Sequence, residues 1–204
     1  MTLPTASTAT VLLLGAFHGL NPAMGWLFAV ARGLQERSRD LLLASIPVIA
    51  LGHLASVALV ALVVTATGSL VTGAALPVAG GLVLVAFGLW RLLSTRHFRW
   101  VGMRLSLGQL AGWSFLMSSA HGAGLMLLPV LTGLPTEGHA GHALSGGLAV
   151  AALHTLAMFV VAGVVALVVY EVLGLTILRR AWFNVDRMWA VALIGAGLVT
   201  LLQT

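Results

Sequence analysis

Six long segments of this chain consist almost entirely of apolar residues, and they limit its fold more than any other feature. They cover residues 10–31, 41–66, 74–93, 107–131, 146–172 and 188–202. Each is close to the roughly 20 residues that a helix needs to cross the hydrocarbon core of a bilayer. Because the backbone must satisfy its own hydrogen bonds in lipid, such segments are expected to be helices. The sequence therefore predicts an all-α, polytopic membrane protein with six transmembrane helices.

The composition agrees with this class. Charged residues make up 7% of the 204 positions and hydrophobic residues 60%, whereas a soluble domain carries about 25% charged residues. The length fits one transmembrane domain, residues 1–204. Cysteine is absent, which excludes disulfides, thiolate metal ligands and cysteine nucleophiles.

All ten arginines fall on one side of a six-helix topology, and lysine is absent. The arginines follow the first segment, separate the third from the fourth, and separate the fifth from the sixth: Arg32, Arg37, Arg39, Arg91, Arg96, Arg99, Arg104, Arg179, Arg180 and Arg187. The positive-inside rule makes this side cytoplasmic. We therefore expect a multi-pass protein of the cell (inner or plasma) membrane with both termini outside. The net charge of +5 then reflects topology and indicates no nucleic-acid partner. A homo-oligomer is compatible with the pattern.

Four histidines repeat in the two halves of the chain. His18 and His53 lie in the first and second apolar segments, and His121 and His154 lie in the fourth and fifth at nearly the same interval. The sequence thus predicts two related halves of three helices each. Three is an odd number, so the second half enters the membrane inverted. Such 3+3 inverted repeats are typical of secondary transporters, with the substrate near the midplane.

The halves span about residues 1–93 and 105–204, and a basic connector, 94–104, joins them. Each half carries a proline after its first histidine. Because proline has no N–H, we expect Pro22 to release the carbonyl of His18, and Pro129 to release that of Leu125.

Polar residues at mid-membrane depth are costly and usually face the bundle interior or a pathway. Imidazole, with an unperturbed pKa of about 6.5, also exchanges protons near neutral pH. We therefore assign a substrate or proton pathway to five residues: His18, Asn21, His53, His121 and His154. Hydrogen bonding between helices is the alternative role for these histidines.

The same four histidines are candidate metal ligands, extended by Met117 and Met158, which lie on the faces of His121 and His154. No acidic residue lies at mid-membrane depth, so a divalent ion would keep its full charge there, at a high cost. Cu(I) with histidine and methionine ligands would be cheaper, and zinc bound by histidines alone is also known. In an outer loop, Glu137, His139 and His142 could collect a cation, and a solvated loop is the alternative.

Six helices in two inverted halves, with His-Gly-Leu-Asn-Pro at residues 18–22, resemble the LysE-type transporter superfamily. That superfamily includes amino-acid exporters and the nickel/cobalt transporters of the NicO group. The resemblance covers most of the chain and implies transport, with His18 and the Asn21–Pro22 step in the pathway. The His-x4-Asp-His motif of the nickel/cobalt group is absent, because Ala23 and Met24 stand where that motif has its aspartate and its second histidine.

The sequence analysis therefore favours a small secondary transporter of a transition-metal cation, with Cu(I), Zn, Ni or Co as substrate and no certain cofactor. The first alternative is a transporter of a neutral or zwitterionic solute. The second is a membrane redox or accessory subunit that binds haem or metal, since a pair of histidines can ligate haem. We expect no enzyme, because the Gly-x-Ser-x-Gly elbow and the His-Glu-x-x-His motif are both absent.

Overall fold

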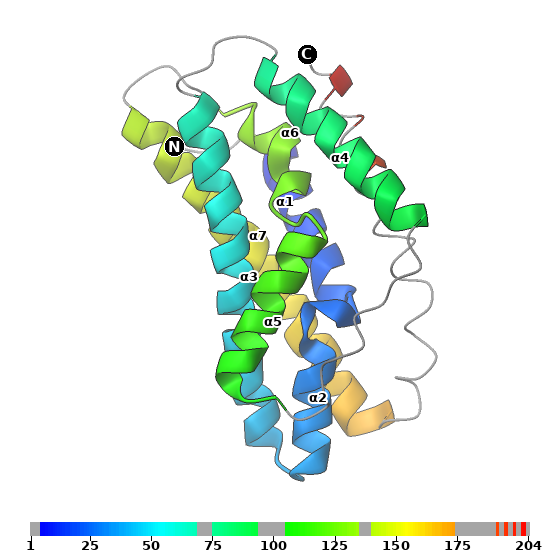
Figure 1. Ribbon diagram of the computed structural model, residues 1–204. Coiled ribbons are helices and arrows are strands. Elements are labelled where there is room, and N and C mark those ends of the chain that lie inside the picture. Colours follow the sequence, from blue (N-terminus) through cyan, green and yellow to red (C-terminus); the bar gives the residue numbers. More distant parts are fainter. Residues whose placement is uncertain are drawn as a thin grey trace.

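The chain folds into helices joined by turns (Figure 1), with no strand in the part that the structure describes. This computed structural model describes residues 5–68, 75–93, 105–134 and 140–173, and positions 191, 194–195, 198 and 201–202. The α-helices are α1 (Thr5–Leu20), α2 (Trp26–Gln35), α3 (Arg39–Gly68), α4 (Ala75–Leu93), α5 (Leu107–Ala120), α6 (Leu128–Leu131) and α7 (Ala140–Val168). Short 3-10 helices η1 (Pro22–Met24) and η2 (Leu125–Leu127) and a π-helical turn η3 (Val169–Leu173) complete them. The all-α class is confirmed.

Two helical spans in the described residues, Arg39–Thr67 and Ala143–Val172, are long and apolar enough to cross a membrane. The bent pair of α5 and α6 is a third if it counts as one span. Shorter apolar stretches lie in α1 and α4. These helices indicate transmembrane character. The sixth predicted segment, 188–202, lies mostly outside the described residues.

The first and fourth apolar segments are each interrupted, so neither forms one continuous helix. The first segment ends as α1 at Leu20 and resumes as α2 after η1, with Gly25 at a φ of 119° between them. The fourth bends by 51° between α5 and the stretch Leu125–Leu131. Gly122, at a φ of 69°, lies in this break. Both glycines adopt the left-handed region that residues with a Cβ avoid.

The two prolines do not release the carbonyls that we expected. The N–H of Asn21 donates to the carbonyl of His18 over 3.1 Å, and the N–H of Leu128 donates to that of Leu125. In both places the chain tightens to a 3-10 turn, so a donor three residues along replaces the missing one.

Large apolar side chains cover the outside of the bundle. In α7, Leu156, Val160 and Val164 follow one another at intervals of four and are each more than half exposed. Residues at that spacing share one helix face. By contrast, the buried residues include four histidines and several hydroxyl side chains. A surface of this kind suits a lipid solvent.

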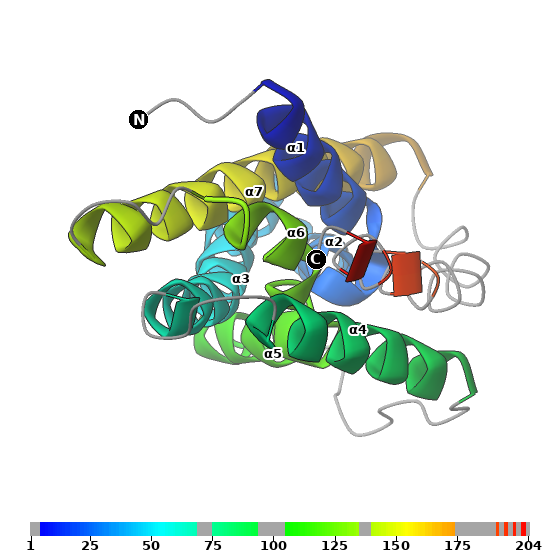
Figure 2. The same cartoon turned by 90° about the horizontal axis from the view of Figure 1, so that it is seen from above.

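The bundle is built on three extensive helix contacts: α1 with α7, α3 with α5, and α3 with α7. In the view down the bundle (Figure 2), α4 runs along one side, and it packs on η2 and α6. Helices α1, α3, α5 and α7 therefore form the centre.

Two apolar clusters fill the interior, one toward each end of the bundle. The arginine-end cluster, near Arg32 and Arg39, is built on residues that include Met24, Phe28, Ile49, Leu110 and Met158. The opposite-end cluster is built on residues that include Val11, Val57, Met126, Leu127 and Val150. In sequence, each of the four buried histidines stands between residues of one cluster and residues of the other: His18, His53, His121 and His154.

Candidate functional site

Three histidines from three different helices meet between the two apolar clusters, and we call them the histidine cluster. They are His18 of α1, His53 of α3 and His154 of α7, and none is exposed. The ring centres of His18 and His154 lie 4.8 Å apart, and each lies 5.4 Å from that of His53. His121, from the break after α5, lies close enough to His18 for the charges of their protonated rings to interact.

The rings of His18 and His121 are oriented by equivalent hydrogen bonds in the two halves. Nδ1 of His18 donates to the carbonyl of Leu14 over 2.9 Å, and Nδ1 of His121 donates to that of Met117 over 2.8 Å. A carbonyl can only accept, so Nδ1 carries the proton and Nε2 is the basic nitrogen of each neutral ring. Histidines that bind metal commonly donate their other ring N–H to a backbone carbonyl in this way.

His53 is held by the hydroxyl of Ser118, which lies on α5. Ser118 is fully buried, and its oxygen also lies 4.0 Å from the sulfur of Met24. Neither Ser118 nor Met24 was among the site residues predicted from the sequence. The internal repeat could have pointed to Ser118. It stands three positions before His121, just as Gly15 stands three positions before His18.

The cluster leaves several buried polar atoms unsatisfied. Within the described part of the chain, Nε2 of His53, Nδ2 of Asn21 and the hydroxyl of Thr155 have no hydrogen-bond partner. His154 faces the backbone of Val11, but neither of its ring nitrogens makes a hydrogen bond of ordinary geometry. Each such atom costs about 1–3 kcal/mol when it is buried without a partner. Atoms left in this state are available to water or to a ligand.

The spacing of the rings fits a shared cation, but their orientation does not. Two imidazoles on one tetrahedral zinc ion, with Zn–N distances of about 2.0–2.1 Å, have ring centres about 5 Å apart. The rings of His53 and His154 are nearly parallel, at an interplanar angle of 19°. No group of three or more His, Asp or Glu side chains in the described ranges is arranged to hold a metal ion. Binding an ion requires rotation of at least one ring.

The remaining predicted residues are distributed as follows. Asn21 is buried at the end of α1, and its Oδ1 accepts from the N–H of Ala23 and caps η1. Met117 and Met158 are buried in the arginine-end cluster. Glu137 and His139 of the outer loop, and the side chain of His142, lie outside the described residues.

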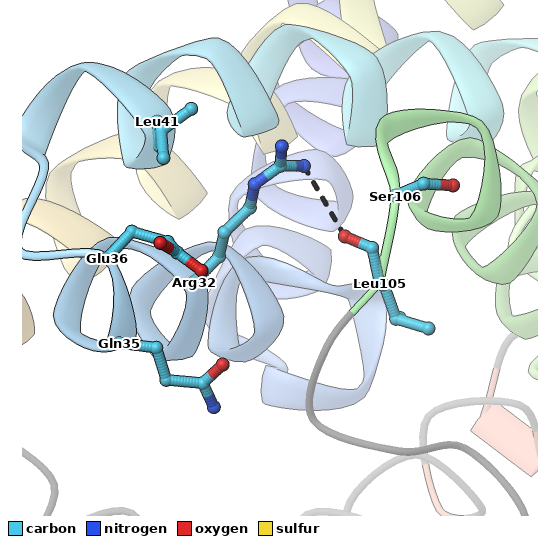
Figure 3. Close-up of a pocket in the computed structure, with 6 residues that line it drawn as sticks. All are labelled: Arg32, Gln35, Glu36, Leu41, Leu105 and Ser106. Atoms are coloured by element: carbon cyan, nitrogen blue, oxygen red, sulfur yellow. Dashed lines mark hydrogen bonds between the residues drawn. The ribbon is translucent and has the colours of Figure 1, made fainter.

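A separate pocket of about 270 Å³ lies at the arginine end of the bundle (Figure 3). It is lined by Arg32, Gln35, Glu36, Leu41, Leu105 and Ser106. The guanidinium of Arg32 points across it and donates to the carbonyl of Leu105 over 3.4 Å. The pocket thus lies where α2, the start of α3 and the start of α5 meet.

The arrangement provides basic imidazole nitrogens, a hydroxyl and a thioether in a closed apolar surrounding, and such a set can bind a cation or move a proton. Comparison with models of protein families, with curated proteins and with solved structures finds no match to this chain.

Proposed function

We propose that this chain is a small secondary transporter that carries a transition-metal cation across the membrane through the histidine cluster. The observation that carries the proposal is the mutual contact of His18, His53 and His154, which come from three helices and are fully buried. Imidazoles buried at mid-membrane depth are costly, and such residues usually mark a substrate or proton pathway. The thioether of Met24 beside Ser118 adds a soft ligand, which favours Cu(I) among the candidate ions.

The apolar clusters on either side of the histidine cluster support alternating access. A substrate at the histidines would be separated from both ends of the bundle by tightly packed side chains. A transporter must open one of these barriers at a time, and the breaks after His18 and around His121 supply half-helices that can move separately. Discontinuous helices at the substrate site are common in transporters.

The contacts between helices support the inverted repeat. If the two halves are exchanged, α1 corresponds to α5 and α3 to α7. The contact of α1 with α7 then becomes that of α5 with α3, and α3 with α7 maps onto itself. The residues at these contacts also correspond: Gly15 lies against the backbone of His154, and Ser118 against the ring of His53.

The proposed orientation follows from the arginines. Arg32, Arg37 and Arg39 lie at or beside the junction of α2 and α3, which the positive-inside rule assigns to the cytoplasm. The arginine-end pocket would then open toward the cytoplasm. Membership of the LysE-type superfamily remains a prediction from the sequence.

A neutral or zwitterionic solute is the second candidate substrate. It is favoured by the finding that no group of three or more His, Asp or Glu side chains in the described ranges is arranged to hold a metal ion. The unsatisfied NH2 group of Asn21 would also suit such a solute, because it can donate to a carboxylate or carbonyl oxygen.

Equilibrium dialysis of the purified protein against Cu(I), Zn, Ni and Co, followed by elemental analysis, tests the metal proposal. We expect about one ion per chain, bound through imidazole nitrogens as in known histidine sites. His154→Ala should lose this ion, and the matched control His97→Ala, in the connector, should keep it.

Two results would overturn the proposal. Absence of bound metal from the wild-type protein, under conditions where it remains folded, would favour the organic solute. A Soret band in the absorption spectrum would favour the redox subunit, since the band is diagnostic of haem.

A further inference from the structure

Hydroxyl side chains in the helices of this protein usually bond to their own helix. Ser45, Thr65, Ser119 and Thr132 each donate to the carbonyl four residues back, over 2.7–2.9 Å. Ser114 of α5 does not follow this pattern. Its hydroxyl is fully buried and has no hydrogen-bond partner in the described part of the chain.

Ser114 lies on the face of α5 that leads to the histidine cluster. Ser118 is one turn further along the same face, and it bonds to His53. In the other direction, Leu110 is buried one turn earlier, and Ser106 lines the arginine-end pocket one turn before that. These four residues, which we call the α5 line, follow one another at intervals of four between the pocket and the cluster.

We propose that the α5 line is the route by which a small hydrated cation passes between the arginine-end pocket and the histidine cluster. In this route Ser114 supplies an oxygen ligand to the cation or to its water, and Leu110 is the apolar constriction that closes the route in the present conformation. The inference rests on the proposed transport function and adds its substrate path.

The chemistry of the α5 line suits a cation. A hydroxyl oxygen that makes no bond within its own helix has lone pairs for an ion or a water molecule. The pocket at the end of the line is lined by one carboxylate, Glu36, and one guanidinium, Arg32. Its lining therefore carries no net positive charge that would repel a cation.

The natural absence of cysteine allows a direct test with Ser114→Cys, a nearly isosteric change. The matched control is Ser45→Cys, because Ser45 is equally buried but satisfies its hydroxyl within α3. A small cationic methanethiosulfonate is added to the arginine side of vesicles that contain each full-length variant. Modification requires a water-accessible thiolate, and a cysteine at position 114 becomes accessible whenever the route opens past Leu110. We therefore expect Ser114→Cys to react at least about tenfold faster than the control.

Leu110→Cys provides a second test, with Leu42→Cys as its control, since both leucines are buried in the arginine-end cluster. Only variants that melt at the wild-type temperature are compared. If both test variants react no faster than their controls, the α5 line is not a route and the inference is wrong.

The outcome is separable from that of the proposed function. If Ser114→Cys reacts fast but the protein binds no metal, the route is supported and a metal ion is not what passes along it. If metal transport depends on the histidines but Ser114→Cys and Leu110→Cys react no faster than their controls, the proposed function stands and only the route is wrong.

Discussion

His53 is held by a hydroxyl from the other half of the chain. Its partner Ser118 lies on α5 and is buried together with it. The sequence could predict that His53 and His154 occupy related places in the two halves, because the spacing of the histidines repeats. It could not predict which nitrogen of each ring is fixed, because that depends on which hydroxyl or carbonyl the packing brings within reach.

Ser118→Ala should weaken cation binding by about 10- to 100-fold, the usual effect of removing a group that orients a metal-binding histidine. Binding is measured by equilibrium dialysis of the purified variants. Ser119→Ala is the control, since the neighbouring Ser119 is exposed and bonds to Ser56. Equal affinity in the two variants would show that Ser118 does not orient the site.

At the scale of helices, the breaks decide where the histidines lie. The sequence drew attention to Pro22 and Pro129, and the first segment does break at Asn21 and Pro22. Pro129 lies in the first turn of α6, a position where proline is tolerated. The chain turns at Gly122 instead, whose left-handed conformation no periodicity of apolar residues could reveal.

The sequence contains two Gly-x-x-x-Gly pairs, Gly15/Gly19 and Gly108/Gly112, and their surroundings differ. A Cβ on Gly15 would collide with the backbone carbonyl of His154, whereas a Cβ on Gly112 would meet no atom of the described residues within 4 Å. A tight helix contact therefore forms at only one of these two glycines, although both have the spacing that favours such contacts.

Gly15→Ala should accordingly destabilise the protein by about 1–3 kcal/mol, as overpacking usually does. Gly112→Ala, the matched control, should be neutral or stabilising by up to about 1 kcal/mol, because alanine is the better helix former. Thermal unfolding in detergent measures both. A Gly15→Ala variant as stable as the control would contradict the close contact of α1 with α7.

At the scale of the whole molecule, large apolar side chains cover the outside, while four histidines and several hydroxyl groups are buried among the apolar residues of the interior. Composition predicted the apolar exterior, because a chain with 7% charged residues cannot cover its surface with charged groups. The orientation in the membrane was inferred from the arginines alone, and only part of them lie in described segments.

Cysteine labelling tests this orientation. Ser38→Cys, between α2 and α3, should react with an impermeant reagent only from the cytoplasm. The positive-inside rule assigns the arginine-rich end of the bundle to that side. Gly141→Cys, at the start of α7, should react from outside. The reverse pattern would invert the topology and the direction in which the arginine-end pocket opens.

Transport by a variant in which His18, His53, His121 and His154 are all changed to alanine tests the central claim most directly. The measurement is the rate of transition-metal uptake into reconstituted vesicles, with His139→Ala/His142→Ala as the control for loss of histidine outside the cluster. We predict that uptake by the fourfold variant falls to that of protein-free vesicles while the control keeps the wild-type rate. Uptake by a folded fourfold variant at the wild-type rate would show that the histidines only pack the interior, and would contradict the account.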